Sequence, residues 1–412
     1  MYKFIHMIIG ILTHHFASNF GANLQTLSTV GYLQEHGHTP IVINWKNSTM
    51  ERDFSSSVSS DQNNEHRKFL EKYLPVTEEC RTDEEIATAI CKHNIQAVIV
   101  GSDAVVQHHP WITRFAFPTR SIISIRKYTS DRLFPNFFWG SFASVIGNKI
   151  PFAFMSVSCQ NSPYNMFSPS TIRGMREACK KFTYISVRDS WTKRMFCKIN
   201  SSYNNIEITP DPVFAFNQNA DKYIPTREDI ISKYGLSKKY MLISFFGNSD
   251  VDNSWIASLT KEMEMCGYQP VSLPFPSGAC HVEGVKEIDL PLSPIDWYAL
   301  IKYSNGFVGR NMHPIVVSLH NSVPFYSLDQ YGTRTLNIFV NKKSSKIFDI
   351  LERAGFQNNR ITLAGIQKQL PSPKSVLNSL ITFDKEKCKR FSELQTQRYN
   401  SMMESILNSF SL

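Results

Sequence analysis

Short apolar segments alternate with helical patterns along the first half of the chain, and this alternation limits the possible folds more than any other feature. Apolar strands are predicted at residues 8–12, 40–45, 97–100, 152–157, 184–187 and 207–209. Stretches with helical spacing separate them, such as residues 23–36. Since parallel strands need long crossovers of this kind, the pattern predicts an α/β fold with a parallel sheet and right-handed connections.

The alternation pauses at residues 216–225, a polar stretch that ends in proline, and then starts again. Further strands are predicted at 240–246, 269–273 and 306–308, with helices at 254–266 and 294–302. The 412 residues are also too many for one ordinary core. We therefore expect two Rossmann-like domains that face a cleft, residues 1–217 and residues 218–412. A long helix ends the chain at 384–409, and its packing back onto the first domain is an open alternative.

The net charge limits the classes of ligand that the protein is expected to bind, and the cysteine and histidine spacing bears on a metal site. The net charge of +9 favours phosphorylated substrates, membrane surfaces or nucleic acid. No arginine-rich run or aromatic RNA-binding signature accompanies the charge, so nucleic acid is not expected. The 8 cysteines form no Cys-x-x-Cys pair, and the histidine pairs at 14–15 and 108–109 lack the spacing of metal ligands. We therefore expect no metal site.

The apolar start of the chain is interrupted by His6 and is too short to span a membrane, which favours a cytoplasmic protein.

Residues 306–325, GFVGRNMHPIVVSLHNSVPF, contain the strongest functional signal. They predict a buried strand, a short loop that holds Arg310, Asn311 and His313, and then an apolar helix. A helix N-terminus offers free backbone N–H groups and a partial positive charge, which suit a phosphate or a carboxylate. The carboxyl edge of a parallel sheet is also the usual ligand side of this fold class. The segment therefore predicts an anion site with a proton donor, His313, beside it.

Two strand ends in the first half carry small and polar residues. Asn19, Gly21 and Asn23 follow the first predicted strand, and Ser102 and Asp103 follow the third. Helix capping explains an Asn or Asp in such a place, and glycine permits a tight turn. The alternative is a loop where a ligand approaches the backbone, with Asp103 as a catalytic or sugar-binding carboxylate. Both interpretations stay open, and neither segment has the spacing of a nucleotide-binding loop.

Two later motifs contain an arginine and an aspartate. Arg188 ends a predicted strand, where its planar fork of donors suits a carboxylate or a phosphate. The alternative is an ion pair with the neighbouring Asp189. Asp211 lies between two prolines that stiffen the chain, which favours a structural corner over a side chain that faces the cleft.

Residues 114–139 stand apart as a basic and aromatic insertion. The segment combines phenylalanines and a tryptophan with Arg114, Arg120, Arg126, Lys127 and Arg132. Contact with a membrane surface or a lipid-linked substrate is one interpretation, since aromatic groups prefer the interface and basic groups attract anionic head groups. The other is an insertion packed on the protein body with solvated charges.

Taken in order, these motifs resemble the polysaccharide pyruvyl transferase family. The matching segments lie between Asn19 and Phe325 and read NFGANLQTLSTVGYLQEHGH, VIVGSDAVV, ISVRDSWT, TPDPVF, LSPIDWYALI and GRNMHPIVVSLHNSVPF. The resemblance implies a two-domain fold similar to the GT-B glycosyltransferases, with phosphoenolpyruvate bound in the cleft. It also implies transfer of the pyruvyl unit to two hydroxyls of one sugar, which forms a cyclic ketal and releases phosphate.

The resemblance also implies roles for individual residues. The family's key histidine corresponds to His313, which would protonate the enol methylene of the donor. Arg188 and Arg310 would bind the anionic groups of the donor, and Asp103 would deprotonate the sugar hydroxyl. Asn311 stands where many members have an arginine. Either Arg310 makes that anion contact, or Asn311 binds phosphate as a neutral donor beside Arg188.

The resemblance implies the partners as well. Asn19, Gly21, Asn23 and Ser102 are expected to line the substrate site, and no cofactor is expected beyond the donor substrate phosphoenolpyruvate. The acceptor would be a sugar of a bacterial capsule, exopolysaccharide or cell-wall polymer. Linkage of that sugar to polyprenyl diphosphate, and peripheral contact with the inner face of the cell membrane, stay open. Two other functions remain: a GT-B-like glycosyltransferase that uses a nucleotide sugar, and a non-catalytic member of the same assembly machinery.

Overall fold

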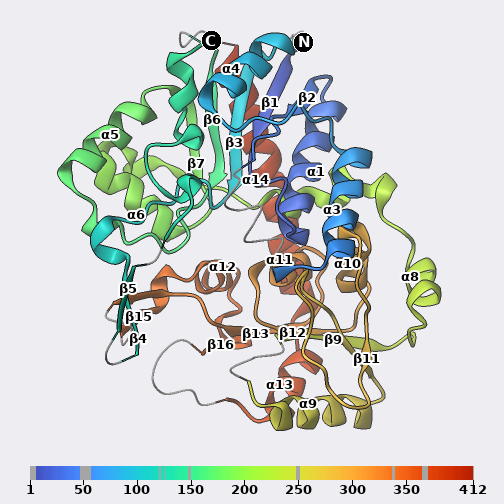
Figure 1. Cartoon of the computed structure of the whole chain (residues 1–412). Helices are drawn as coiled ribbons and strands as arrows, with labels where there is room; N and C mark the ends of the chain where they lie inside the picture. Colours follow the sequence, from blue (N-terminus) through green and yellow to red (C-terminus); the bar gives the residue numbers. More distant parts are fainter. Residues whose placement is uncertain are drawn as a thin grey trace.

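Two parallel sheets, one in each half of the chain, form the frame of the molecule (Figure 1). The computed structural model describes residues 6–46, 57–119, 122–125, 127–146, 150–246, 251–335, 339–363 and 370–411. The first sheet has 6 strands in the order β2-β1-β3-β6-β7-β8, and all its pairings are parallel. Its strands are β1 (Ile8–Leu12), β2 (Thr39–Val42), β3 (Ala97–Asp103), β6 (Phe152–Val157), β7 (Phe182–Val187) and β8 (Glu207–Ile208).

The second sheet also has 6 parallel strands, in the order β11-β10-β9-β12-β13-β16. Its strands are β9 (Tyr240–Ser244), β10 (Gln269–Ser272), β11 (Lys286–Glu287), β12 (Phe307–Gly309), β13 (Phe325–Asp329) and β16 (Arg360–Thr362). Two antiparallel hairpins accompany the sheets, β4 (Phe115–Thr119) with β5 (Ile122–Ile125), and β14 (Thr333–Thr335) with β15 (Phe339–Asn341).

Helices cover both faces of each sheet, because alternate strand residues point to opposite sides. The helices of the first half are α1 (Phe20–Glu35), α3 (Ser60–Tyr73), α4 (Asp83–Lys92), α5 (Pro169–Cys179), α6 (Ser190–Ile199) and α7 (Phe216–Asn219). Those of the second half are α8 (Arg227–Tyr234), α9 (Asn253–Met265), α10 (Pro294–Lys302), α11 (Met312–His320), α12 (Lys346–Ala354), α13 (Pro373–Ile381) and α14 (Lys385–Phe410). In β3, Ile99 packs toward α1 and α14, while Val98 and Val100 pack toward α4, α5 and α6. Both sheets are therefore doubly wound.

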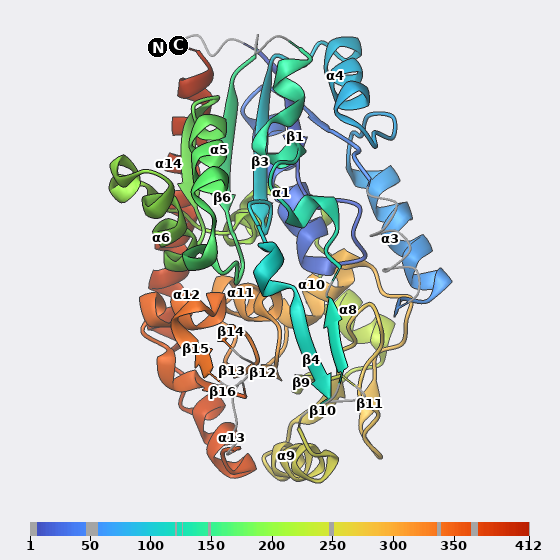
Figure 2. The ribbon, with the colours of Figure 1, turned by 60° about the vertical axis from the view of Figure 1, so that its left-hand side comes forward.

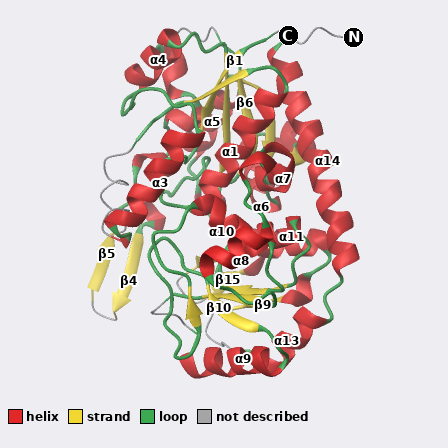
Figure 3. Cartoon of the chain, turned by 90° about the vertical axis from the view of Figure 1, so that its right-hand side faces the viewer, coloured by secondary structure: helices red, strands yellow, loops and turns green. Residues whose placement is uncertain are grey.

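One continuous apolar core joins the two sheets. Phe20 of α1 stacks on Trp297 of α10, with ring centroids 5.3 Å apart. The terminal helix α14 runs along the molecule from the second half to the first (Figures 1 and 3). Its Tyr399 meets Tyr32 of α1 edge to face, and the Arg398 guanidinium donates a hydrogen bond to the Ile208 carbonyl at 2.7 Å. Packing between the halves therefore fixes the relative position of the two sheet edges.

The structure confirms the predicted fold class, and the predicted strands fall on the observed ones within a few residues. Between the strand start at Phe325 and the terminal helix the sequence shows no clear pattern, yet β16, α12 and α13 lie there. These elements are short, with only 3 residues in β16 and 9 in α12, so their hydrophobic period is hard to detect.

The insertion at 114–139 divides into an apolar part that packs inside and a hairpin that projects. Phe138 and Trp139 are buried in the core beside β6, so these aromatic side chains are not available to a membrane. The β4–β5 hairpin reaches from the first half toward the level of the second sheet (Figure 2). Arg120 and Arg126 lie outside the described residues. Within the part of the chain that the structure describes, no helix is long and apolar enough to cross a membrane.

Candidate active site

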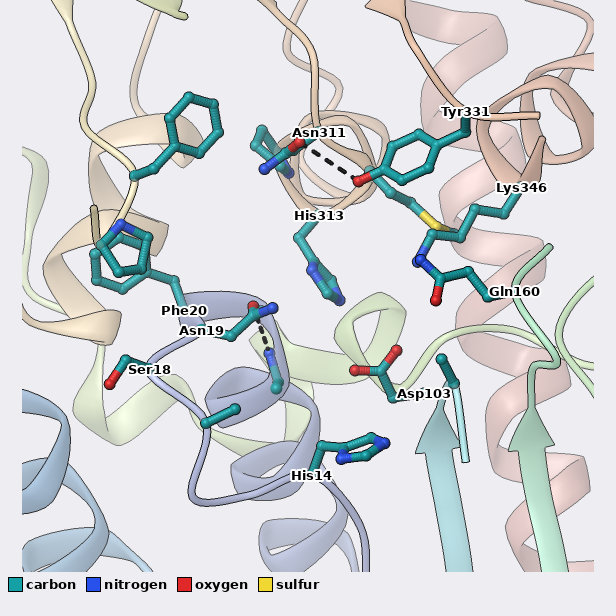
Figure 4. A pocket seen from close by; sticks show the side chains of 18 of the residues that line it. His14, Ser18, Asn19, Phe20, Asp103, Gln160, Asn311, His313, Tyr331 and Lys346 are labelled. Carbon is teal, nitrogen blue, oxygen red and sulfur yellow. Dashed lines mark hydrogen bonds between the residues drawn. The ribbon is translucent and has the colours of Figure 1, made fainter. Parts of the chain in front are cut away.

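A pocket of about 240 Å³ lies where the carboxyl edges of the two sheets approach each other. The first half lines it with loops after β1, β3 and β6, and the second half with the first turns of α11 and α12 (Figure 4). Three helices, α1, α11 and α12, start at this pocket with Asn19, Asn311 and Ser345 as their N-caps. The positive ends of three helix dipoles therefore converge there, which favours an anionic ligand.

His313 occupies the middle of the pocket, on the first turn of α11 rather than in the loop before it. Its ring lies directly against the backbone of Gly21, the second residue of α1. A Cβ atom on Gly21 would stand 2.0 Å from His313 Cγ and 2.2 Å from Nδ1. Only a residue without a side chain fits there. Gly21 is therefore needed to leave space for the imidazole ring, and not for the backbone conformation of the turn.

Burial among protein atoms lowers the pKa of His313 from 6.5 to about 4. The carboxylates of Asp211 and Asp103 act in the opposite direction and offset part of this shift. Nε2 of the ring is buried and has no hydrogen-bond partner among the described residues. The imidazole is therefore neutral near pH 7, and an added negative charge nearby would raise its pKa.

Asp103 ends β3 and faces the pocket beside His313. Its φ of +87° is rare for a residue other than glycine, so the chain here departs from ordinary strand geometry to aim the carboxylate. Burial by itself raises the pKa of this carboxyl group. The Arg188 guanidinium, 3.2 Å away, and the Lys346 charge together outweigh burial and hold the pKa well below its usual range. Asp103 is therefore a permanent negative charge and a weak base.

Arg188 lies beneath the pocket and does not line it. Its side chain is 2% exposed, and its two terminal nitrogens donate to Asp211 at 2.8 Å and to Asp103 at 3.2 Å. The position predicted for it, in direct contact with a donor anion, is therefore not the one observed. Its charge is already matched by two carboxylates, and its role in the described geometry is to hold Asp103.

The other side of the pocket is built around Asp329, which is fully buried at the end of β13. The Tyr331 backbone N–H donates to one of its oxygens at 2.7 Å, and the Ser345 hydroxyl donates to the other at 2.5 Å. These bonds place the Tyr331 ring and the start of α12 at the pocket. The Tyr331 hydroxyl in turn donates to the Asn311 side chain at 3.4 Å (Figure 4). Asn311 makes no side-chain cap bond, so its amide group faces the pocket.

The sequence matches the family model described as polysaccharide pyruvyl transferase over residues 19–330. This segment contains the helix N-terminus with Gly21, the end of β3 with Asp103, and the first turn of α11 with His313. The chain belongs to the polysaccharide pyruvyl transferase family. The sequence has no match among curated proteins.

The fold of this pyruvyl transferase family member is similar to that of solved sugar-nucleotide enzymes. A putative UDP-N-acetylglucosamine 2-epimerase from Listeria monocytogenes superposes with a TM-score of 0.53 at 11% identity, covering 98% of this chain and 96% of the other. The Neisseria meningitidis UDP-GlcNAc 2-epimerase bound to UDP-GlcNAc gives 0.52 at 12% identity, with 97% and 99% covered. Phytolacca americana UGT2 gives 0.50 at 10% identity, with 98% and 100% covered. These enzymes have the GT-B fold, and at this identity the likeness shows the fold alone.

Four of the residues expected at the site of this family member line the pocket together with Asp103, namely Asn19, Gly21, Asn311 and His313. Asn19 also caps α1, since its side chain accepts a hydrogen bond from the Ala22 N–H at 3.3 Å. Asn19 therefore both caps α1 and lines the pocket, so the two interpretations of this residue from the sequence are compatible.

Asn23 and Ser102 do not line the pocket, and both are fully engaged in the protein body. The Asn23 amide donates to the His15 carbonyl at 2.9 Å and its oxygen contacts His66 Nδ1 at 2.7 Å, which ties the β1 loop to α3. The Ser102 hydroxyl donates to the Ser156 carbonyl at 2.8 Å. Their prediction as substrate-binding residues is therefore not supported by their positions. Arg310 is likewise buried, 4% exposed, and absent from the pocket lining.

Other pocket residues carried no clear signal in the sequence. Lys346 and Tyr331 come from the patternless stretch after Phe325, and Arg132 comes from the insertion. His14 directly follows the first loop residue after β1, is 8% exposed, and leaves Nδ1 without a partner in the described structure. The feature of the sequence that could have indicated His14 is its position between a predicted strand and the helix that follows. Among the residues that the structure describes, no cluster of three or more His, Cys, Asp or Glu side chains is arranged to hold a metal ion.

Proposed function

We propose that this family member transfers the pyruvyl group of phosphoenolpyruvate to two hydroxyls of one sugar, during assembly of a bacterial polysaccharide. The observation that carries the proposal is the pairing of His313 with three helix N-termini in one pocket. Phosphoenolpyruvate is an anion whose enol needs a proton before its C2 atom can be attacked. The pocket offers both a site for the anion and a group that can supply the proton.

The reaction begins when His313 gives a proton to the methylene carbon, which becomes a methyl group while C2 becomes electrophilic. One sugar hydroxyl adds to C2 and loses its proton. The C2–O bond to phosphate then breaks, and the second hydroxyl adds in its place and loses its proton. The products are one cyclic ketal and one inorganic phosphate, which carries away a proton. His313 must be charged for the first step, and the negative charges of the donor supply the field that raises its pKa.

Asp103 serves the acceptor side of this reaction. As a permanent carboxylate it accepts a hydrogen bond from a sugar hydroxyl and stabilises the imidazolium form of His313. Its depressed pKa makes it a poor base on its own. His14 lines the same pocket and leaves Nδ1 without a hydrogen-bond partner among the described residues, so it is available to take up the hydroxyl proton.

A lipid-linked acceptor is supported by an exposed surface formed by the start of the insertion and the residues just before it. Trp111, Ile112 and Ile125 are 58%, 63% and 48% exposed, and Ile125 pairs with Phe115 at the same end of the β4–β5 hairpin. The Arg114 guanidinium lies over the Trp111 ring, 5.7 Å from its centre, and Lys127 is exposed nearby in sequence. Exposed Trp and Ile beside cations suit the surface of an anionic membrane. This surface, residues 111–114 with 125 and 127, would hold the enzyme beside a polyprenyl-diphosphate-linked sugar.

Vesicle binding tests the membrane contact separately from catalysis. Wild-type protein should co-sediment with vesicles containing phosphatidylglycerol, and the Trp111→Ser, Ile112→Ser double variant should lose most of that binding. Ile381→Ser is the control, since Ile381 is 53% exposed elsewhere on the molecule. Equal sedimentation of all three proteins would remove the membrane contact and leave the pocket chemistry untouched.

The transfer itself is tested by mass spectrometry of the product. Phosphoenolpyruvate is incubated with the protein and a panel of free and lipid-linked glycans, and both phosphate and acceptor mass are followed. The proposal predicts phosphate release only when an acceptor is present, with a pyruvyl ketal on that acceptor. Turnover of a nucleotide sugar with no response to phosphoenolpyruvate would instead make the protein a glycosyltransferase.

A further inference from the structure

Few cations face the pocket, although the proposed donor carries several negative charges. Among the described residues that line it, Arg132 and Lys346 are the only arginine or lysine side chains. Arg188 is committed to two aspartates below the pocket, and Arg310 is buried outside it. The Arg132 side chain lies 3.9 Å from the Asp131 carboxylate, which offsets its charge. Lys346 is therefore the main candidate for a cation that contacts an anion in this pocket.

Lys346 is held in place by the start of α12, of which it is the first residue. The Ser345 hydroxyl caps the helix by accepting from the Phe348 N–H at 3.2 Å, and it is itself anchored on Asp329. The remainder of α12 is fastened to the first half of the molecule. Its Asp349 accepts a hydrogen bond from the Ser190 N–H at 3.1 Å, and Arg353 donates to the Arg188 carbonyl at 3.3 Å. Lys346 thus reaches the pocket from a helix that is held in place by contacts with both halves of the molecule.

The Lys346 ammonium group has no ion-pair partner among the described residues, and the nearest carboxylates act on it from a distance. No carboxylate of the described residues lies within ion-pair distance of it, and its nitrogen stands 5.5 Å from the centre of the Tyr331 ring. Figure 4 shows its side chain extending toward Gln160 on the same side of the pocket as Asn311 and Tyr331. Burial lowers its pKa, and the neighbouring Arg188 charge lowers it further, while the carboxylates of Asp103, Asp189 and Asp211 offset part of this shift. A partly buried cation with no ion pair in the described part of the chain is the kind of group that an incoming anion stabilises.

We infer that Lys346 and the N-terminus of α12 bind the phosphate group of the donor, beside His313. The inference rests on the proposed function for the identity of the donor, and on the structure for the position of the cation. A lysine suits a phosphate as a point charge, and the free N–H groups of the helix start add to it. Lys346 lies beyond residue 330, where the family match ends, so the family pattern does not assign it.

Calorimetric titration with phosphoenolpyruvate, and separately with inorganic phosphate, tests this assignment. Loss of a charged hydrogen bond should weaken binding of both ligands to Lys346→Met by about 10- to 100-fold. Lys343→Met is the matched control, because Lys343 is exposed three residues earlier, and it should bind like wild type. Equal affinity of Lys346→Met and wild type would overturn the assignment. Wild type that binds phosphate but not phosphoenolpyruvate would instead contradict the proposed function.

A second variant separates the charge of Lys346 from any effect on folding. Lys346→Arg keeps a positive charge at every working pH, whereas the lysine has a pKa below 10.5 and loses its charge as pH rises toward that value. Affinity of the wild type for phosphate should therefore fall at alkaline pH faster than that of Lys346→Arg. Parallel profiles for the two proteins would show that the lysine does not contact the anion.

Discussion

The contact between His313 and Gly21 joins the two halves of the chain at the level of single residues. The imidazole comes from α11 and rests on the first turn of α1. A residue of one half therefore sets the position of the proposed catalytic group on the other. The sequence contains both residues in motifs, but nothing in it indicates that they touch.

Gly21→Ala is expected to displace the His313 ring, because the new methyl group would lie 2.0 Å from Cγ. Activity should fall about 100-fold, the cost expected when a reacting group is displaced by about an ångström. Circular dichroism and the thermal midpoint should show that the fold is retained. The control is Gly306→Ala, whose methyl group would come no closer to its neighbours than 3.3 Å from a Leu380 methyl and 3.5 Å from the Met241 side chain. Unchanged turnover in Gly21→Ala would show that the position of His313 does not govern the reaction.

Binding of phosphoenolpyruvate should be accompanied by proton uptake at His313. The ring is neutral before the donor binds, since its pKa is about 4, and the negative donor raises that pKa. Calorimetry in buffers with different ionisation enthalpies measures the number of protons, which we expect to be about one near neutral pH. His313→Gln should bind the donor without this uptake. Identical proton counts in the two proteins would assign the uptake to another group.

At the level of secondary-structure elements, Arg188 links the ends of three strands beneath the pocket. It lies at the end of β7, and its two partners are Asp103 at the end of β3 and Asp211 after β8. Asp211 also accepts from the Gln25 side chain of α1 at 2.5 Å. The VRD and PDP motifs are therefore one buried charge network, which supports the structural interpretation of Asp211.

Arg188→Met should destabilise the fold by about 3–5 kcal/mol, because it leaves two buried carboxylates without their cation. Chemical unfolding monitored by fluorescence measures the loss. Lys180→Met is the comparison, since the exposed Lys180–Glu177 pair at 2.7 Å contributes at most about 1 kcal/mol. A stable Arg188→Met protein with weakened donor binding would restore Arg188 as a direct ligand.

The strand ends were the part of the site that could be predicted from the sequence. Asp103, Asn311 and His313 follow apolar strands, and the carboxyl edges of parallel strands meet on one side. The sequence could not show which side chains at those strand ends face the pocket. Ser102 and Asp103 are adjacent, and only the observed backbone conformation turns the Asp103 side chain toward it. Lys346 was missed for another reason. The short elements after Phe325 give no period that would place it at a helix start.

On the scale of the whole molecule, several buried histidines link the stability of the fold to pH. Burial lowers the pKa of His15, His66, His108 and His313 to about 4, and that of His320 to about 3. In the unfolded chain these groups have a pKa of about 6.5. The unfolded state therefore binds more protons between these values, so stability is complete above pH about 6.5 and declines as pH falls toward 4.

The thermal midpoint should accordingly be constant above neutral pH and fall by several degrees between pH about 6.5 and 5. Differential scanning calorimetry across this range measures it. A midpoint that stays level down to pH about 5 would mean that the buried histidines are already charged in the folded protein. His66→Gln should lessen the decline, since it removes one of the groups that must gain a proton on unfolding.

Phosphate release from phosphoenolpyruvate is the most direct test of the central claim, that His313 drives pyruvyl transfer in the pocket between the sheets. Release should depend on a sugar acceptor with two free hydroxyls in the wild type. In His313→Gln it should fall about 10²- to 10⁴-fold, the usual contribution of a general acid, while donor binding persists. Full activity in His313→Gln, or no acceptor-dependent release by the wild type across free and lipid-linked glycans, would contradict it.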